Sequence, residues 1–363
     1  MRIAVFHELD FGGARRTVSE FAKRLNKILD VDLYYIDDKK ERGLRKNYKN
    51  VFYYPFHPKS WKGKNWKIRL YKDTIELFKL YNLHKKIALN IELKNYDYIL
   101  VHPSKFTQAP FLLRFLSNKC IYYCQEPLRM VYDPYLSNIS SIKFPKFFYE
   151  FLIRKIRKWI DIYNLKNTKT ILANSNFSKE FIEKSYGKKA EVCYLGVETS
   201  LFKPLDIAKT IDVLFIGNKN KGYDLLNKSL KFFKTKPKVY TIFRKNKKKN
   251  VSDKELVIIY NKSKVLVALN QNEPFGLIPL EAMACGIPVI AVNEGGYRES
   301  IINGKTGYLT ERNTKALRDL ILRLLNNDKL RIDMGEDARK HVEEKWTWDK
   351  STDRFLQIIK YAK

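Results

Sequence analysis

Two glutamates in the second half of the chain, Glu273 and Glu281, flank a short turn whose residue types suit phosphate binding. A buried strand is expected to end at Asn270, a tight loop with Gly276 follows, and a helix is expected to begin near Leu277. The unpaired N–H groups of a first helical turn and the helix dipole attract anions. A glycine also lets a phosphate approach the backbone closely. Residues 272–291 therefore predict an anion site at a helix N-terminus.

The two carboxylates add hydrogen-bond acceptors for hydroxyl groups to this site. We expect Glu281 in the first turn of the helix and Glu273 on the carboxyl side of the strand. This combination fits a sugar nucleotide, whose diphosphate would lie against Phe275, Gly276 and Leu277. One glutamate would then hold the ribose and the other the transferred sugar. The alternative is a helix-start glutamate that favours the dipole and a loop glutamate in solvent.

The elements that would position these residues alternate between short apolar runs and longer segments with helical apolar spacing. Such alternation is typical of parallel β-α-β units, whose right-handed crossovers build a doubly wound sheet. In the first half the expected strands are Ile3–His7, Val31–Ile36, Val51–Tyr54, Tyr98–His102, Ile121–Cys124, Thr170–Ala173 and Val192–Leu195, and the expected helices include Val18–Leu29 and Thr74–Ile91.

A second alternating set follows. Its expected strands are residues 212–217, Val239–Phe243, Val265–Asn270 and Pro288–Val292. Ser252 and Glu255 form a capping box before a helix through Leu256–Asn261. We therefore expect two α/β domains, residues 1–204 and 205–345, and a last segment at 346–363. Ligands of such folds usually bind at the carboxyl ends of the parallel strands, here in a cleft between the two domains.

The chain of 363 residues has a formal net charge of +31, because 70 Lys and Arg stand against 39 Asp and Glu. This excess attracts an acidic partner such as nucleic acid, an anionic membrane or a phosphorylated ligand. Apolar residues make up 45% of the chain, which excludes a disordered polybasic protein. No apolar run reaches the length of about 18 residues that a membrane-spanning helix needs, and the N-terminus begins as a strand rather than a signal peptide. The four cysteines form no CxxC pair and fit buried thiols in a reducing, cytoplasmic setting.

The stretch from Asn272 to Ala291 resembles the E-x7-E signature of glycosyltransferase family 4, the retaining GT-B enzymes. The following residues match that family too, with Gly295-Gly296-Tyr297-Arg298-Glu299 and then residues 303–309. The resemblance extends over nearly the whole chain, since residues 173–178, 195–202 and 346–348 are similar to family motifs around the domain linker and the last helix. It implies a GT-B architecture of two Rossmann-like domains that face a central cleft. In the family the last helix crosses back onto the N-terminal domain.

In the first half, Gly12 and Gly13 resemble the family's glycine loop, which approaches the donor phosphate and the acceptor. His102, at the end of a strand, matches the family's active-site histidine. Without the resemblance, the glycines would indicate an ordinary strand–helix turn and the histidine a structural role. Residues 123–129 are similar to a cleft loop of many relatives.

The chain departs from the family where two cations hold the donor diphosphate. The family's Lys-Gly is present as Lys221-Gly222, but Asn218 stands where relatives have an arginine. Lys219 or Arg244 could supply the second charge, and Lys219 could also be one more surface lysine. The loops that frame the nucleotide base are shorter than in the family, so the nucleotide is not predicted.

The resemblance implies a metal-independent, retaining transfer of a hexose from a nucleotide-diphospho-sugar to a glycan or lipid-linked acceptor, without a cofactor. Lys221, Glu273 and His102 would carry the chemistry. Asp30-Val31-Asp32 matches the D-x-D metal motif of another architecture, but it precedes a strand far from the donor motifs, which makes the match a coincidence.

Two segments combine basic and aromatic residues, 59–72 and 143–166. As a helix, the second one places Phe148, Leu152, Ile156, Trp159 and Tyr163 on one stripe and Arg154, Arg157, Lys158 and Asp161 opposite. The stripe either packs on the sheet or enters an anionic membrane surface, where the cytoplasmic protein would bind peripherally on the inner face. No specific nucleic-acid partner is expected, since no known nucleic-acid motif is present. The alternative functions are a non-catalytic GT-B-like protein that binds nucleic acid or anionic lipid, and a sugar-nucleotide epimerase.

Overall fold

The structure is a computed structural model that describes residues 1–10, 12–41, 43–58, 66–117, 119–133, 137–138, 142, 144, 146–217, 222–243 and 251–361. The chain forms two compact units. The first comprises Met1–Asn174, Lys179–Cys193 and Lys360–Lys363, and the second comprises Ser175–Ser178 and Tyr194–Ile359. The junction that the sequence suggests, at residues 204 and 205, lies a little further along the chain than this boundary between Cys193 and Tyr194.

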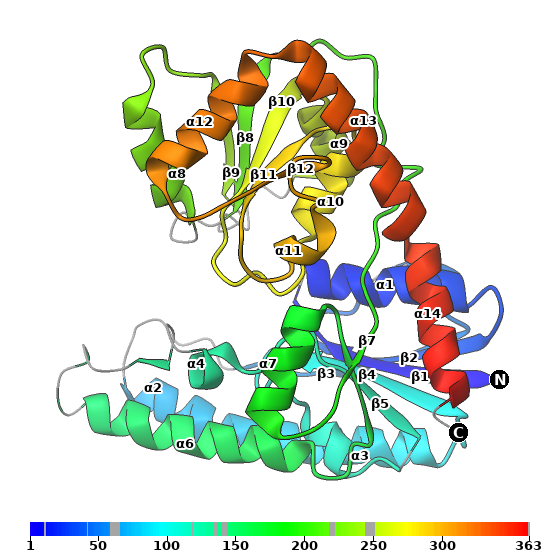
Figure 1. The fold of residues 1–363 in the computed structure, drawn as a ribbon. Helices are drawn as coiled ribbons and strands as arrows, with labels where there is room; N and C mark the ends of the chain where they lie inside the picture. Colours follow the sequence, from blue (N-terminus) through cyan, green and yellow to red (C-terminus); the bar gives the residue numbers. More distant parts are fainter. Residues whose placement is uncertain are drawn as a thin grey trace. The chain divides into compact units, whose positions relative to one another are not determined.

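The first unit is built on a seven-stranded parallel sheet in the order β3-β2-β1-β4-β5-β6-β7. Its strands are β1 (Arg2–Glu8), β2 (Asp30–Asp37), β3 (Asn50–Pro55), β4 (Tyr98–Ser104), β5 (Cys120–Tyr123), β6 (Thr170–Ala173) and β7 (Glu191–Val192). Its helices are α1 (Gly13–Leu25), η1 (Leu44–Lys46), α2 (Trp66–Tyr71), the π-helical η2 (Lys72–Glu76), α3 (Leu77–Glu92), η3 (Phe111–Arg114), α4 (Arg129–Tyr132), α6 (Lys146–Asn164) and α7 (Asn176–Tyr186). In Figure 1, α1 lies on one face of this sheet and α3 and α6 lie on the other.

These strands form because their residues are apolar on both faces, as a parallel sheet covered by helices requires. Strands β1, β2 and β4 are buried along almost their whole length. The expected strands are confirmed in this unit with small shifts, except that β7 is only two residues long. The expected helices are confirmed as α1, which begins earlier at Gly13, and as η2 followed by α3.

The second unit has a five-stranded parallel sheet in the order β12-β11-β10-β8-β9. Its strands are β8 (Ile211–Gly217), β9 (Val239–Phe243), β10 (Ser263–Ala268), β11 (Val289–Val292) and β12 (Gly307–Thr310). Its helices are α8 (Asp224–Ser229), η5 (Leu230–Phe232), α9 (Asp253–Lys262), α10 (Leu277–Ala284), α11 (Tyr297–Ser300), α12 (Thr314–Leu325), α13 (Asp328–Lys345) and α14 (Trp348–Tyr361). Helices α8 and α12 lie on one face of this sheet, and α9 and α10 lie on the other (Figure 1).

Both sheets have the doubly wound topology that the sequence predicts, and each has one point where the strand order reverses. The reversal lies between β1 and β4 in the first sheet and between β8 and β10 in the second. Strand β12 is an element that the sequence analysis did not assign. The capping box is confirmed, because the Ser252 side chain accepts from the Glu255 backbone and Glu255 accepts from the Ser252 backbone.

The amphipathic segment at 146–164 is the helix α6, and its orientation tests the expectation that its stripe packs on the sheet. All five residues of the aromatic and aliphatic stripe, Phe148, Leu152, Ile156, Trp159 and Tyr163, are exposed. The expectation that this stripe packs on the sheet is therefore wrong. Among the described residues, no helix is both long and apolar enough to cross a membrane.

Candidate functional site

The loop that carries Glu273 follows β10, at the point where the strand order of the second sheet reverses. Ligands of doubly wound sheets usually bind outside the carboxyl ends of the strands at this point. The Asn270 side-chain amide donates to Glu273 Oε2 at 2.9 Å. Asn272 has a left-handed φ of 47°, which turns the chain sharply before Glu273. The Glu273 carboxylate is therefore held at the edge of the sheet where a ligand is expected.

Gly295 and Gly296 press directly against the backbone of this loop. A Cβ atom on Gly295 would lie 2.3 Å from the Glu273 carbonyl oxygen, and one on Gly296 would lie 2.7 Å from the Pro274 carbonyl oxygen. The Gly296 N–H donates to the Glu273 carbonyl at 2.9 Å. Only glycine allows so close an approach. The glycine pair thus fixes the backbone that presents the Glu273 side chain.

Other contacts hold the next two residues of the loop. The Ser175 hydroxyl donates to the Pro274 carbonyl at 2.5 Å. The Phe275 ring is buried, with its centroid 6.3 Å from that of Tyr194 and 5.7 Å from that of Trp346. Because both the backbone and the ring are fixed, the start of α10 is held in place before any ligand arrives.

Helix α10 begins at Leu277, after Gly276 in a left-handed conformation with a φ of 100°. The expectation that Glu281 lies in the first turn is wrong: the helix has no acidic residue there, and Glu281 follows in the second turn. Glu281 is buried, and its Oε2 accepts a hydrogen bond from the Tyr260 hydroxyl of α9 at 2.8 Å. The left-handed glycine sets the first helical residue, and the turn in which Glu281 lies follows from it.

Arg312 is a residue of this edge that the sequence analysis missed. It follows β12, pairs with Glu294 at 2.6 Å, and donates to the Leu269 carbonyl at 3.3 Å. Glu294 in turn accepts from the Asn272 N–H at 3.3 Å. This chain of contacts ties the loop after β10 to the loops after β11 and β12. Only the strand order places Arg312 here, so no local motif could have revealed it.

All three expected phosphate-binding cations, Lys219, Lys221 and Arg244, lie outside the described residues. Their neighbour Gly222 is described. It has a φ of 93°, and a Cβ atom there would lie 2.2 Å from the Leu269 carbonyl oxygen. The chain that returns from the loop after β8 therefore passes directly against the end of β10, next to the Glu273 loop.

In the first unit, the expected residues lie where the strand order reverses between β1 and β4. Gly12 immediately precedes α1, Gly13 is the first residue of that helix, and the Gly12 carbonyl accepts from Arg16 N–H at 3.0 Å. His102 lies inside β4, which continues to Ser104, rather than at the strand's last position. The glycine turn thus follows β1, and the histidine lies near the carboxyl end of the adjacent parallel strand β4.

The His102 side chain is fully buried, and neither ring nitrogen has a hydrogen-bond partner among the described residues. Its ring centroid is 5.7 Å from that of Tyr123. Burial lowers the pKa of His102 to about 3 from an ordinary value of 6.5. A neutral imidazole has one N–H donor and one acceptor nitrogen. The neutral ring of His102 can therefore donate at one nitrogen and accept at the other.

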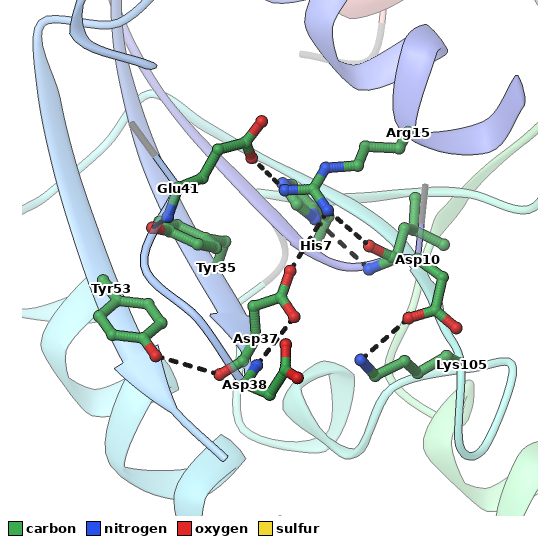
Figure 2. Close-up of polar contacts among 10 residues, drawn as sticks. His7, Asp10, Arg15, Tyr35, Asp37, Asp38, Glu41, Tyr53 and Lys105 are labelled. Carbon is green, nitrogen blue, oxygen red and sulfur yellow. Dashed lines mark hydrogen bonds and ion pairs between the residues drawn. The ribbon is translucent and has the colours of Figure 1, made fainter. Parts of the chain in front are cut away.

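A network of charged side chains surrounds the same edge (Figure 2). Arg15 pairs with Asp37 at 3.2 Å and with Glu41, and Lys105 pairs with Asp10 at 3.2 Å. The buried His7 accepts the Leu9 N–H at Nδ1. Burial, and secondarily the positive charge of Arg15, lowers the pKa of His7 well below its ordinary value. No local motif reveals this network, because its members come from helix α1 and from the carboxyl ends of β1, β2 and β4 and the loops after them.

A cavity of about 260 Å³ opens beside these strand ends. Phe56 follows β3, and Lys105 and Phe106 follow β4, while Lys72 of η2 and Arg157 of α6 line the cavity from the helices. The lining combines aromatic rings and three cationic groups with the carboxylate of Glu76. Such a cavity can hold a ligand that has an apolar part and also hydroxyl or acidic groups.

The D-x-D string takes part in packing. The Asp32 carboxylate is buried and accepts from the Tyr96 hydroxyl at 2.6 Å and the Asn50 amide at 2.9 Å. Asp30 pairs with Lys49 at 2.6 Å. The described residues contain no cluster of three His, Cys, Asp or Glu that could hold a metal ion. The four cysteines are free and buried.

Residues 245–341 match the model of the family described as glycosyl transferases group 1. An uncharacterized glycosyltransferase of Methanocaldococcus jannaschii is 30% identical over 208 residues, which are 52% of this chain and 58% of that protein. The N-acetyl-alpha-D-glucosaminyl L-malate synthase of Bacillus anthracis is 40% identical over 97 residues, 26% of each chain. The chain thus spans little more than half the length of the first of these relatives and about a quarter of the second.

The solved structures that resemble the protein cover nearly its whole length. Sucrose-phosphate synthase of Thermosynechococcus elongatus has a TM-score of 0.71 at 15% identity, over 99% of this chain and 98% of that one. Anabaena HepE, in complex with UDP and glucose, has a TM-score of 0.68 at 16% identity, over 99% and 100%. The protein therefore has the GT-B architecture that the sequence predicts. The group 1 glycosyl transferase match contains the Glu273 loop, α10 and the Gly295–Gly296 pair.

Gly295 lies so close to the Glu273 backbone that an added methyl group should strongly lower the stability of the second unit. Gly295→Ala should destabilise the second unit by about 2 kcal/mol more than Gly304→Ala, because both glycines have left-handed φ but only the first meets backbone atoms. Urea unfolding of the two variants measures the difference. Equal losses of unfolding free energy in the two variants would show that Gly295 does not pack tightly against the Glu273 carbonyl.

The burial of His102 predicts that its ring stays neutral from about pH 8 down to about pH 5, since its pKa lies near 3. Proton NMR of the five histidine rings, with the His102 signal assigned from a His102→Gln variant, follows each titration. A midpoint near the ordinary pKa of 6.5 would contradict the burial of the ring.

Proposed function

We propose that the protein is a glycosyltransferase that moves a sugar from a nucleotide-diphospho-sugar to an acceptor hydroxyl. The observation that carries the proposal is the Glu273 loop, which the glycine pair clamps where the strand order of a GT-B second sheet reverses. A fixed carboxylate beside a helix N-terminus suits a ligand with both hydroxyl groups and a diphosphate. The match of residues 245–341 to group 1 glycosyl transferases supports this reading.

In this proposal the second unit binds the donor. The backbone N–H groups around Phe275, Gly276 and Leu277 face the diphosphate, with Lys221 and either Lys219 or Arg244 as cations. Glu273 accepts from hydroxyl groups of the transferred sugar. Glu281 is assigned to the ribose by resemblance to family 4, and its bond to Tyr260 would hold the carboxylate in place. UDP is the first nucleotide to test, since the similar HepE was solved with it.

The first unit binds the acceptor in this proposal. The cavity beside Lys105 and Phe106 and the polar network around Arg15 supply hydrogen-bonding groups at the carboxyl ends of the strands. The Gly12–Gly13 turn lies at the same edge. The neutral His102 would donate or accept a hydrogen bond to a sugar hydroxyl. We propose a glycan or lipid-linked acceptor, because the cavity combines cationic and aromatic side chains.

We further propose retention of configuration, as the resemblance to family 4 implies, with a hexose as the transferred sugar. The acceptor oxygen would form its bond to the anomeric carbon on the face from which the diphosphate leaves. Its proton would pass to a departing phosphate oxygen, so no covalent enzyme intermediate is required. Fixed cations and helix N–H groups can stabilise the leaving diphosphate without a metal ion or a cofactor. The four free, buried cysteines support a reducing, cytoplasmic setting.

The Glu273→Gln variant should lower kcat for sugar transfer from UDP-sugars by about 10- to 100-fold, since a charge-assisted hydrogen bond to the sugar is lost. Release of nucleoside diphosphate in the presence of acceptor glycans measures the rate. Glu336→Gln, an exposed change on α13, is the control and should keep the wild-type rate. Unchanged turnover in the Glu273 variant would contradict the proposed role of Glu273 in binding the transferred sugar. Diphosphate release that needs no acceptor and yields no transferred sugar would indicate an epimerase instead.

The stereochemistry and the metal requirement are tested together. The new glycosidic bond should keep the anomeric configuration of the donor, which NMR of the anomeric proton reads directly. Excess EDTA should leave the rate unchanged, because protein cations and N–H groups neutralise the leaving group. An inverted product would overturn the retaining mechanism. Loss of activity in EDTA with recovery on adding Mg²⁺ or Mn²⁺ would overturn metal independence.

A further inference from the structure

Helix α6 exposes its apolar side, whereas an ordinary surface helix buries it. Both of its acidic residues, Glu150 and Asp161, are buried. Eight large apolar side chains on its other side are between 39% and 62% exposed: Phe147, Phe148, Phe151, Leu152, Ile156, Trp159, Ile162 and Tyr163. We call these eight residues the α6 outer face. A helix in water normally buries its apolar side and exposes its charges, so this arrangement indicates a different environment.

The inward charges lock the rotation of α6. Arg69 of α2 pairs with Glu150, and Arg157 pairs with Asp73 of η2. Asp161 accepts from the Ala109 N–H at 2.9 Å and from the Tyr186 hydroxyl at 2.7 Å. To turn the apolar side inward, the helix would have to break these contacts and leave buried charges unpaired, which is costly. The outer face is therefore a stable feature of the fold.

The outer face is rich in aromatic rings. The Phe147 and Phe151 rings stack at 6.4 Å, and the Trp159 and Tyr163 rings stack at 5.2 Å. Arg114 lies 4.5 Å from the Tyr163 ring and further supports it. Aromatic side chains, above all Trp and Tyr, are enriched where proteins meet the headgroup region of a bilayer.

The charge on the exposed side of α6 is entirely positive. Lys146, Lys155, Lys158 and Lys166 are exposed at the helix or just after it, while its acidic residues are buried. Lys155 lies 4.3 Å from the Phe151 ring, so cationic and aromatic groups intermix. A second copy of this chain would bring the same positive surface and repel it. An anionic surface with an apolar interior complements both features.

We propose that the α6 outer face docks onto an anionic lipid bilayer, with the helix parallel to the membrane plane. The rings of Phe148 and Trp159 enter the boundary between headgroups and acyl chains, and the lysines contact lipid phosphates. Binding at such a surface holds a protein peripherally, without a membrane-spanning segment. The proposal rests on α6 alone and is independent of the transferase reaction.

Vesicle flotation with the full chain tests this proposal. The wild type should float with vesicles of phosphatidylcholine and phosphatidylglycerol in equal parts and only weakly with phosphatidylcholine alone. The double variant Phe148→Ser/Trp159→Ser should bind the anionic vesicles at least about 10-fold more weakly, because two membrane-inserted rings are lost. Both residues are exposed, so the fold should survive. The control Ile28→Ser/Ile332→Ser removes two equally exposed apolar side chains outside α6 and should bind as the wild type does.

A charge variant measures the electrostatic contribution to membrane binding separately from that of the apolar rings. Lys155→Glu/Lys158→Glu should weaken binding to anionic vesicles by more than about 10-fold, since each lysine near an anionic leaflet contributes about 5-fold. The control Lys329→Glu/Lys340→Glu makes the same charge change on α13 and should have a much smaller effect. Equal weakening by both pairs would overturn the assignment of the surface to α6.

Two other outcomes would overturn the proposal. The first is a wild type that does not float with anionic vesicles. The second is a wild type that sediments as a dimer while the Phe148→Ser/Trp159→Ser variant sediments as a monomer, which would make the outer face a contact between copies. Sugar transfer to a soluble acceptor should be unchanged in the double variant, so loss of membrane binding and failure of the proposed reaction are told apart.

Discussion

The contact of the Gly295–Gly296 backbone with the Glu273–Pro274 backbone is the constraint on which the candidate donor site depends. It requires two residues without side chains in the loop after β11 and a loop of fixed shape after β10. Because the two strands are parallel neighbours, their carboxyl ends meet and the two loops can pack. The Arg312–Glu294 pair and the Ser175 hydroxyl then hold the same loop from other directions. A carboxylate fixed in this way loses little conformational entropy when a ligand binds.

The first unit follows the same geometric rule with different chemistry. Its reversal point collects His7, Asp10, Lys105 and the buried His102 at the ends of β1 and β4. Burial keeps His102 neutral, and the positive charges of Arg15 and Lys105 add to burial in keeping His7 neutral. Neutral donors and acceptors in a protected position favour hydroxyl groups over free phosphates. In the proposed function, local electrostatics as well as the fold would thus separate the acceptor site from the donor site.

The parallel sheets could be predicted because strands buried on both faces form continuous apolar runs, such as Ile3–Phe6 and Val213–Ile216. The start of α10 at Leu277 could be predicted as well. Glu281, four residues further on, lies beyond a first turn of about 3.6 residues, so the expectation for Glu281 is wrong although the helix start is right. Arg312 and the network around Arg15 escaped prediction because they are assembled by strand order. For α6, the spacing revealed which residues share a side, but not which side faces the protein. That choice is made by Arg69 and Asp73, which lie far away in the sequence.

The exposed apolar side of α6 has a free-energy cost in water, which a different environment could compensate. Burying apolar area is worth about 25 cal/mol per Å², so eight exposed apolar side chains forgo several kcal/mol of stability. Natural domains rarely expose a contiguous apolar patch of this kind unless it meets a partner. Ion pairs on the inner side offset part of the cost and prevent the helix from turning over. In the docking that we propose, a bilayer surface would recover the remainder, and the lysines would make that recovery specific for anionic lipid.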